Sequence, residues 1–132
     1  MKNNFPVSLI IPFYKSEKDI LKCIETIESQ DIKDKIEIIF VDDCSKDSTA
    51  KIIENSQLLN YNILTLNENK GPSAARNKGL AVARGEYVFF LDVDDTIEST
   101  TLSSLYETAK QGNYDMVFCD KQRIYDNKNF IF

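Results

Sequence analysis

Short apolar runs and amphipathic segments alternate along the whole chain. Short apolar runs bounded by turn residues are typical of strands, and apolar residues recurring every three or four positions indicate helices. The predicted strands are residues 7–12, 36–41, 61–66, 87–91 and 116–119. The predicted helices are residues 20–27, 49–56, 73–83 and 102–109. This alternation predicts an α/β fold, with a mostly parallel sheet and helices on both faces.

Length and charge narrow the class of protein. A chain of 132 residues predicts a single domain. The net charge of −5 argues against nucleic acid as a partner. The first apolar run is too short to span a membrane and lacks a signal-peptide pattern, so we expect a cytoplasmic protein. The three cysteines, Cys23, Cys44 and Cys119, are expected to be reduced thiols.

Polar residues follow each of the first four predicted strands, at residues 12–15, 42–43, 67–71 and 92–95. Parallel strands bring their carboxyl ends to one edge of a sheet, which is where open α/β sheets bind ligands. We therefore expect these four segments to form one ligand-binding crevice.

The segment 92–95 carries three carboxylates, Asp92, Asp94 and Asp95, directly after an apolar run that suggests a central strand buried on both faces. Crowded carboxylates repel each other, and a divalent cation held by oxygen ligands relieves that repulsion. The chain has no histidine, so a metal would need oxygen ligands. The alternative is an acidic loop that caps the N-terminus of a helix.

Three other side chains are candidates for ligand contacts. Tyr14 is either a surface aromatic or a residue that stacks on a base. Asp43 is either a helix cap or an acceptor for a base N–H or a ribose hydroxyl. Arg76 is either solvated or in contact with phosphate, and the helix that follows Gly71 offers backbone N–H groups to an anion.

Four segments together resemble the motifs of family 2 glycosyltransferases of the GT-A type, in the order of that family. They are VSLIIPFY (7–14), EIIFVDDCSKDST (37–49), NKGPSAARNKG (69–79) and LDVDD (91–95). The resemblance covers residues 7–120 and implies the Rossmann-like, nucleotide-binding half of the GT-A fold. Lys15 departs from the asparagine that many members have there.

The resemblance implies a nucleotide-sugar donor, most often a UDP-sugar, and a saccharide or other acceptor. The residues it places around the base and ribose are Pro12, Tyr14, Glu17 and Asp43. It places Gly71, Arg76 and Asp92 along the rest of the donor. Asp94 and Asp95 would hold Mg²⁺ or Mn²⁺, which bridges the phosphates and stabilises the leaving nucleoside diphosphate.

Members of this family continue further and carry their acceptor site and catalytic aspartate in the later part. We therefore expect residues 1–132 to form a single nucleotide-sugar-binding domain without that region, and the catalytic base stays unassigned. The expected function is glycosyl transfer in polysaccharide biosynthesis, and a catalytically inactive binding module is the alternative. Peripheral attachment to the inner membrane face, and a homodimer formed through the apolar residues 130–132, are left open.

Two other families share part of the pattern. FLDVDDTI (90–97) resembles the nucleophile motif of haloacid-dehalogenase-like phosphatases, in which Asp92 would attack phosphate and Asp94 would be the general acid. That motif normally ends the first strand of its fold, whereas three strand–helix units precede it here. A phospho-receiver domain would use Asp42, Asp43, Asp92 and Lys121, but Lys121 comes one strand too early.

Overall fold

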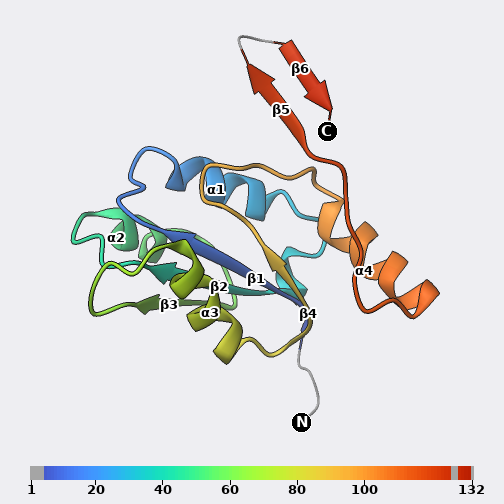
Figure 1. Ribbon diagram of the computed structural model, residues 1–132, viewed down its shortest axis with the longest axis horizontal. Coiled ribbons are helices and arrows are strands. Elements are labelled where there is room, and N and C mark those ends of the chain that lie inside the picture. The colour runs from blue at the N-terminus through green and yellow to red at the C-terminus, as the bar shows by residue number, and fades with distance from the viewer. Residues whose placement is uncertain (1–4, 126–127, 132) are drawn as a thin grey trace.

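The computed structural model describes residues 5–125 and 128–131 and contains a parallel sheet of four strands (Figure 1). The strands of this sheet are β1 (Phe5–Phe13), β2 (Glu37–Asp42), β3 (Tyr61–Thr65) and β4 (Gly85–Phe90). The helices are α1 (Ile20–Glu28), the 3₁₀ turn η1 (Lys33–Lys35), α2 (Thr49–Glu54), α3 (Pro72–Val82) and α4 (Thr101–Gly112). The strand order is β3-β2-β1-β4, with every neighbouring pair parallel. The predicted α/β class is confirmed.

Helices cover both faces of the sheet because β1 is apolar on both. Leu9 and Ile11 point into the larger core, which α1, α2 and α4 help to close. Ile10 points the other way, into a smaller core with Ala75 of α3. Alternate residues of a strand face opposite sides of its sheet, so an unbroken apolar run needs a cover on each side.

The fourth predicted strand is present as β4 but lies at an edge of the sheet, and the fifth is absent from the described residues. Residues 116–119 form no strand, and Phe118 is 83% exposed. Consequently β4 pairs only with β1, and the expectation of a central strand buried on both faces is wrong. An apolar run favours an extended backbone, but a strand also needs a hydrogen-bonding neighbour. A cavity of about 450 Å³ lies beside this edge, between β4 and α4.

The last part of the chain forms a separate antiparallel pair, β5 (Gln122–Tyr125) and β6 (Lys128–Ile131). The apolar segment 130–132, on which the homodimer hypothesis depends, runs beyond the described residues. Within residues 5–125 and 128–131, every helix falls short of the length and apolar character needed to cross a membrane.

Close packing of α3 against the sheet depends on Gly79. A Cβ atom at this position would lie 2.6 Å from Cγ2 of Ile10 and 3.3 Å from Cγ2 of Val41. Ile10 and Val41 are both fully buried, so neither methyl group has free space into which to move. The absent side chain therefore sets how near α3 approaches β1 and β2.

Gly79→Ala should destabilise the fold. Overpacking costs about 1–3 kcal/mol, and better helix propensity returns about 1 kcal/mol. We expect a net loss of about 1 kcal/mol from these two terms, seen as a lower Tm in thermal unfolding. Leu80→Ala, at the neighbouring exposed position of α3, is the control. Equal Tm values for Gly79→Ala and wild type would contradict the close contact.

A buried carboxylate joins three strands at the amino-terminal end of the sheet. Glu37 is 1% exposed and accepts hydrogen bonds from the Ser8 hydroxyl (2.6 Å) and from the backbone N–H and Nε of Arg84 (both 2.8 Å). The Ser8 oxygen also accepts from the backbone N–H of Gly85 at 2.7 Å. Burial by itself would raise the pKa of Glu37, but these hydrogen bonds and the Arg84 charge outweigh it and lower the pKa.

The lowered pKa of Glu37 predicts a pH-dependent contribution to stability. The ionised carboxylate stabilises the fold above its ordinary pKa of about 4.3, and this contribution is lost as the pH falls through the lower folded-state pKa. The Tm difference between wild type and Glu37→Gln should therefore be wide at neutral pH and narrow in acid. Glu25→Gln, on the exposed side of α1, is the control and should show a small difference throughout.

Candidate functional site

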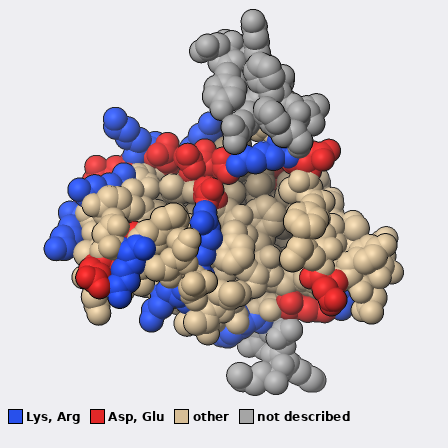
Figure 2. Space-filling view, viewed as in Figure 1, with Lys and Arg blue, Asp and Glu red and all other residues tan. Residues whose placement is uncertain are grey.

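The predicted meeting of polar segments at one edge of the sheet is confirmed by the strand pairing. All four strands run parallel, so the segments after β1, β2, β3 and β4 leave from the same edge. The ladder continues briefly beyond the strands, since Asp43 N–H donates to Phe13 O (2.9 Å) and Leu91 N–H donates to Ile10 O (3.0 Å). In Figure 2 acidic and basic side chains alternate along the upper rim of the molecule.

Asp43 fixes the segment that leads into α3. Its two carboxylate oxygens accept hydrogen bonds from the backbone N–H groups of Lys70 (2.7 Å) and Gly71 (2.8 Å). The side chain is nearly buried, with the residue 4% exposed. Asp43 therefore holds the start of α3 and does not cap α2, whose N-cap is Ser48. Its contact with a base or ribose stays a prediction.

Gly71 makes the sharp entry into α3 possible. Its φ of 89° lies in the left-handed region, which a residue with a Cβ atom rarely adopts, and Pro72 then starts the helix. The two N–H bonds to Asp43 hold the loop at this turn.

A cavity of about 640 Å³ lies among the loops after β1, β2 and β3. Its lining residues are Tyr14, Lys15, Cys44, Ser45, Lys46, Asp47, Asn67, Glu68 and Asn69. Lys15, Cys44 and Lys46 all have positive φ values, which in residues other than glycine are found most often in tight turns and at functional sites. The loops are tied together by Lys15 N–H, which donates to Ser45 Oγ at 2.9 Å.

The residues predicted after β1 lie at different depths. Tyr14 is 44% exposed at the cavity, with the Lys15 ammonium 5.2 Å from its ring centre. Glu17 is exposed and accepts a hydrogen bond from the Ser48 N–H at 2.8 Å. Pro12 is buried within β1, opposite Val41. The structure thus places only Tyr14 of these three in the cavity lining.

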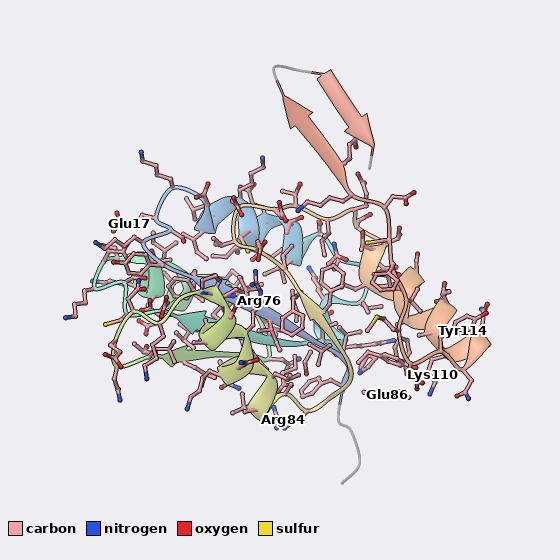
Figure 3. All side chains as sticks on the ribbon, viewed as in Figure 1. Glu17, Arg76, Arg84, Glu86, Lys110 and Tyr114 are labelled. Atoms are coloured by element: carbon pink, nitrogen blue, oxygen red, sulfur yellow. The ribbon has the colours of Figure 1, made fainter. Side chains whose placement is uncertain are left out.

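The acidic segment does not form the crowded group that its sequence suggests. Asp92 pairs with Arg76 at 2.6 Å, and Asp95 pairs with Lys121 at 3.3 Å. Figure 3 shows Arg76 and Arg84 toward opposite ends of α3. Among residues 5–125 and 128–131, no three Asp, Glu, Cys or His side chains gather as a metal site would require. Arg76 and Lys121 thus offset part of the repulsion among these carboxylates, and the expected metal stays a prediction.

The helix-capping alternative for the acidic segment is also wrong. The next helix, α4, begins at Thr101, and its first turn contains no acidic residue. Asp94 is exposed and Asp95 is only partly buried, so their oxygens can face a ligand. Mg²⁺ is commonly held by one or two carboxylates together with the phosphates of a ligand. The residues present therefore fit a metal that arrives with a diphosphate.

Several residues of this edge were missed in the sequence. Ser45 bonds through both its N–H and its hydroxyl to Asp42 Oδ1, and Cys44 Sγ lies 3.7 Å from the carbonyl oxygen of Asn67. Their position directly after a strand is the signal that could have found them. Cys23, by contrast, lies in the core, where burial raises the pKa of its thiol to about 12, so it is not a reactive group.

Comparison with known proteins identifies the class. Residues 8–132 match the sequence model described as Glycosyl transferase family 2. The chain belongs to glycosyl transferase family 2, which confirms the resemblance seen in its motifs. The phosphatase and phospho-receiver alternatives are overturned by this match.

Two curated relatives show how much of a longer protein the chain covers. It is 40% identical over 124 residues to the cholesterol galactosyltransferase of Borreliella burgdorferi, covering 93% of the chain and 34% of that protein. It is 40% identical over 115 residues to the GalNAc(5)-diNAcBac-PP-undecaprenol beta-1,3-glucosyltransferase of Campylobacter jejuni, covering 85% of the chain and 37% of that protein. The chain thus spans about a third of the length of these relatives.

Solved structures confirm the GT-A fold. TarS of S. aureus in complex with UDP-GlcNAc superposes with a TM-score of 0.77 at 37% identity, over 81% of this chain and 32% of that one. The mannosyltransferase PcManGT of Pyrobaculum calidifontis, in complex with GDP-Man and Mn²⁺, gives 0.68 at 28% identity, over 80% and 31%.

Asp43→Asn should loosen the loop before α3. An amide offers one acceptor oxygen where the carboxylate offers two, so one of the two N–H groups loses its partner. We expect a loss of about 1–3 kcal/mol in the free energy of unfolding and faster hydrogen exchange at Lys70 and Gly71. Asp47→Asn is the control, because exposed Asp47 accepts a single N–H bond that an amide oxygen can keep. Unchanged exchange at both positions would contradict this role.

Proposed function

We propose that residues 1–132 form the single domain that binds the nucleotide-sugar donor of a glycosyl transfer reaction. The observation that carries this proposal is the cavity at the carboxyl edge of a parallel sheet, between Tyr14 and the loops held by Asp43, in a chain of this family. UDP is the proposed nucleotide because TarS, at 37% identity, binds UDP-GlcNAc.

In this proposal the base and ribose lie against the loops after β1 and β2. Tyr14 supplies an exposed aromatic face, and Pro12, Glu17 and Asp43 shape the surrounding loops. The diphosphate lies toward Gly71, whose loop opens α3, and toward Arg76. The guanidinium of Arg76 is one third exposed while paired with Asp92, so it can also face an incoming phosphate.

Asp94 and Asp95 are the proposed ligands of Mg²⁺ or Mn²⁺. Such a cation, when bound, acts as a Lewis acid that neutralises charge on the leaving nucleoside diphosphate. The chemistry of the residues supports this role, because exposed carboxylate oxygens suit hard cations. The Mn²⁺ in the PcManGT complex supports it independently.

The proposed reaction transfers a glycosyl group from the nucleotide to a hydroxyl of a saccharide or another acceptor. The names of the relatives, which include a cholesterol galactosyltransferase and a glucosyltransferase acting on an undecaprenol-linked glycan, support an acceptor at or near a membrane and a role in surface-glycan synthesis. We place the protein in the cytoplasm, where nucleotide sugars are the donors.

UDP should bind more tightly with Mn²⁺ than in EDTA when measured by calorimetry. Asp94→Asn should remove much of that gain while leaving Tm nearly unchanged, because Asp94 is exposed. The control is Asp34→Asn, another exposed acid, which lies within η1 at the other end of the sheet. GDP and dTDP belong in the same series, since tighter binding of either would replace UDP as the nucleotide. If UDP, GDP and dTDP all bound with the same affinity in Mn²⁺ and in EDTA, the metal role would be contradicted.

A further inference from the structure

The acidic loop, residues 92–95, is anchored at its start by regular structure but not at its end. Leu91 N–H continues the β4–β1 ladder by donating to Ile10 O. Nine residues, 92–100, then pass before α4 begins at Thr101. Backbone N–H and C=O groups that are withdrawn from water need partners. Two partners are local, since Asp95 N–H donates to Asp92 O and Thr101 N–H donates to Glu98 O, both at 3.0 Å. Others come from α1 and from the residues just after it.

Thr26 of α1 supplies the hydrogen bonds that a neighbouring strand would otherwise give to the backbone of Ile97. Its hydroxyl accepts a hydrogen bond from the Ile97 N–H and donates one to the Ile97 carbonyl oxygen, both at 3.0 Å. Thr26 is buried, and the Ile97 side chain packs against the main core. One side chain thus satisfies both backbone groups of Ile97, two residues after the end of the acidic loop.

Gln30, just past the end of α1, continues the same attachment. It is 2% exposed, and its Nε2 donates to the carbonyl oxygens of Glu98 (2.8 Å) and Thr26 (3.2 Å). Its Oε1 accepts from the Leu102 N–H at 3.4 Å, in the first turn of α4. The backbone N–H of Asp31 donates to Ser99 O at 2.9 Å.

We propose that Thr26 and Gln30 are positioning residues for metal-dependent donor binding, which rests on the function proposed above. They hold Ile97 and Glu98 while β1 holds Leu91, so the loop that carries Asp94 and Asp95 is fixed at both ends. Both side chains are buried, and neither lines the cavity at Tyr14. Their contribution is to remove conformational freedom that the loop would otherwise lose on binding.

Thr26→Val tests this proposal because it keeps the shape of the side chain and removes both bonds to Ile97. UDP affinity with Mn²⁺ should fall about tenfold or more, as is usual when the support of a metal ligand is lost. UDP affinity in EDTA should stay at the wild-type value. Thr26→Ser keeps the hydroxyl and should restore the Mn²⁺-dependent affinity. If Thr26→Val lowered the UDP affinity equally in Mn²⁺ and in EDTA, Thr26 would have a general structural role, and the proposal would be overturned.

Hydrogen exchange of the ligand-free chain tests the attachment separately from the proposed function. In Thr26→Val the amides of residues 93–98 should exchange faster than in wild type, while those of β1 and β2 should change little. Ile53→Val, a conservative change of a buried α2 side chain, is the control for a general loss of stability. It should not raise the exchange rates of residues 93–98 selectively.

The two measurements separate the possible failures. Wild-type protein that shows no Mn²⁺-dependent nucleotide binding refutes the proposed function, whereas the exchange data still decide whether α1 holds the loop. Unchanged exchange at residues 93–98 in both Thr26→Val and Gln30→Met overturns the positioning role, whatever the binding data show.

Discussion

Parallel pairing of β1 with β2 on one side and β4 on the other is the interaction on which the rest of the structure depends. Because the strands share one direction, every loop that follows a strand leaves from the same edge. The helices that return the chain cover both faces of β1 and bury its apolar side chains. Topology therefore brings the loops after all four strands to one edge, although Tyr14 and Asp95 are far apart in the chain.

Much of this fold could be predicted from hydrophobic patterning. The first four strands and all four helices lie close to where their periodicity placed them, because each buries an apolar run or stripe in a core. Residues 116–119 show the limit of that method. Patterning shows that a segment prefers to be extended, but strand formation depends on a neighbour whose presence the pattern does not encode.

The motifs drew attention to Asp43, Arg76 and Asp92 as site residues, and that role stays a prediction. Their ion pairs and backbone contacts could not be predicted, because these depend on distances that arise only after folding. Asp43 accepts hydrogen bonds from the N–H groups of Lys70 and Gly71, and Asp92 forms an ion pair with Arg76. Thr26 escaped notice because a threonine on the buried face of a helix gives no sign of a partner 71 residues away.

The two arginines of the α3 region form ion pairs in very different surroundings. Arg84 pairs with a carboxylate that is almost fully enclosed, whereas Arg76 and Asp92 are both open to solvent. Mobile ions screen exposed pairs strongly and buried pairs weakly. Added salt should consequently weaken the attachment between α3 and the acidic loop more than the link between Arg84 and the enclosed carboxylate of Glu37. Ionic strength is thus a means of softening the ligand-binding edge while the buried link at the other end of the sheet persists.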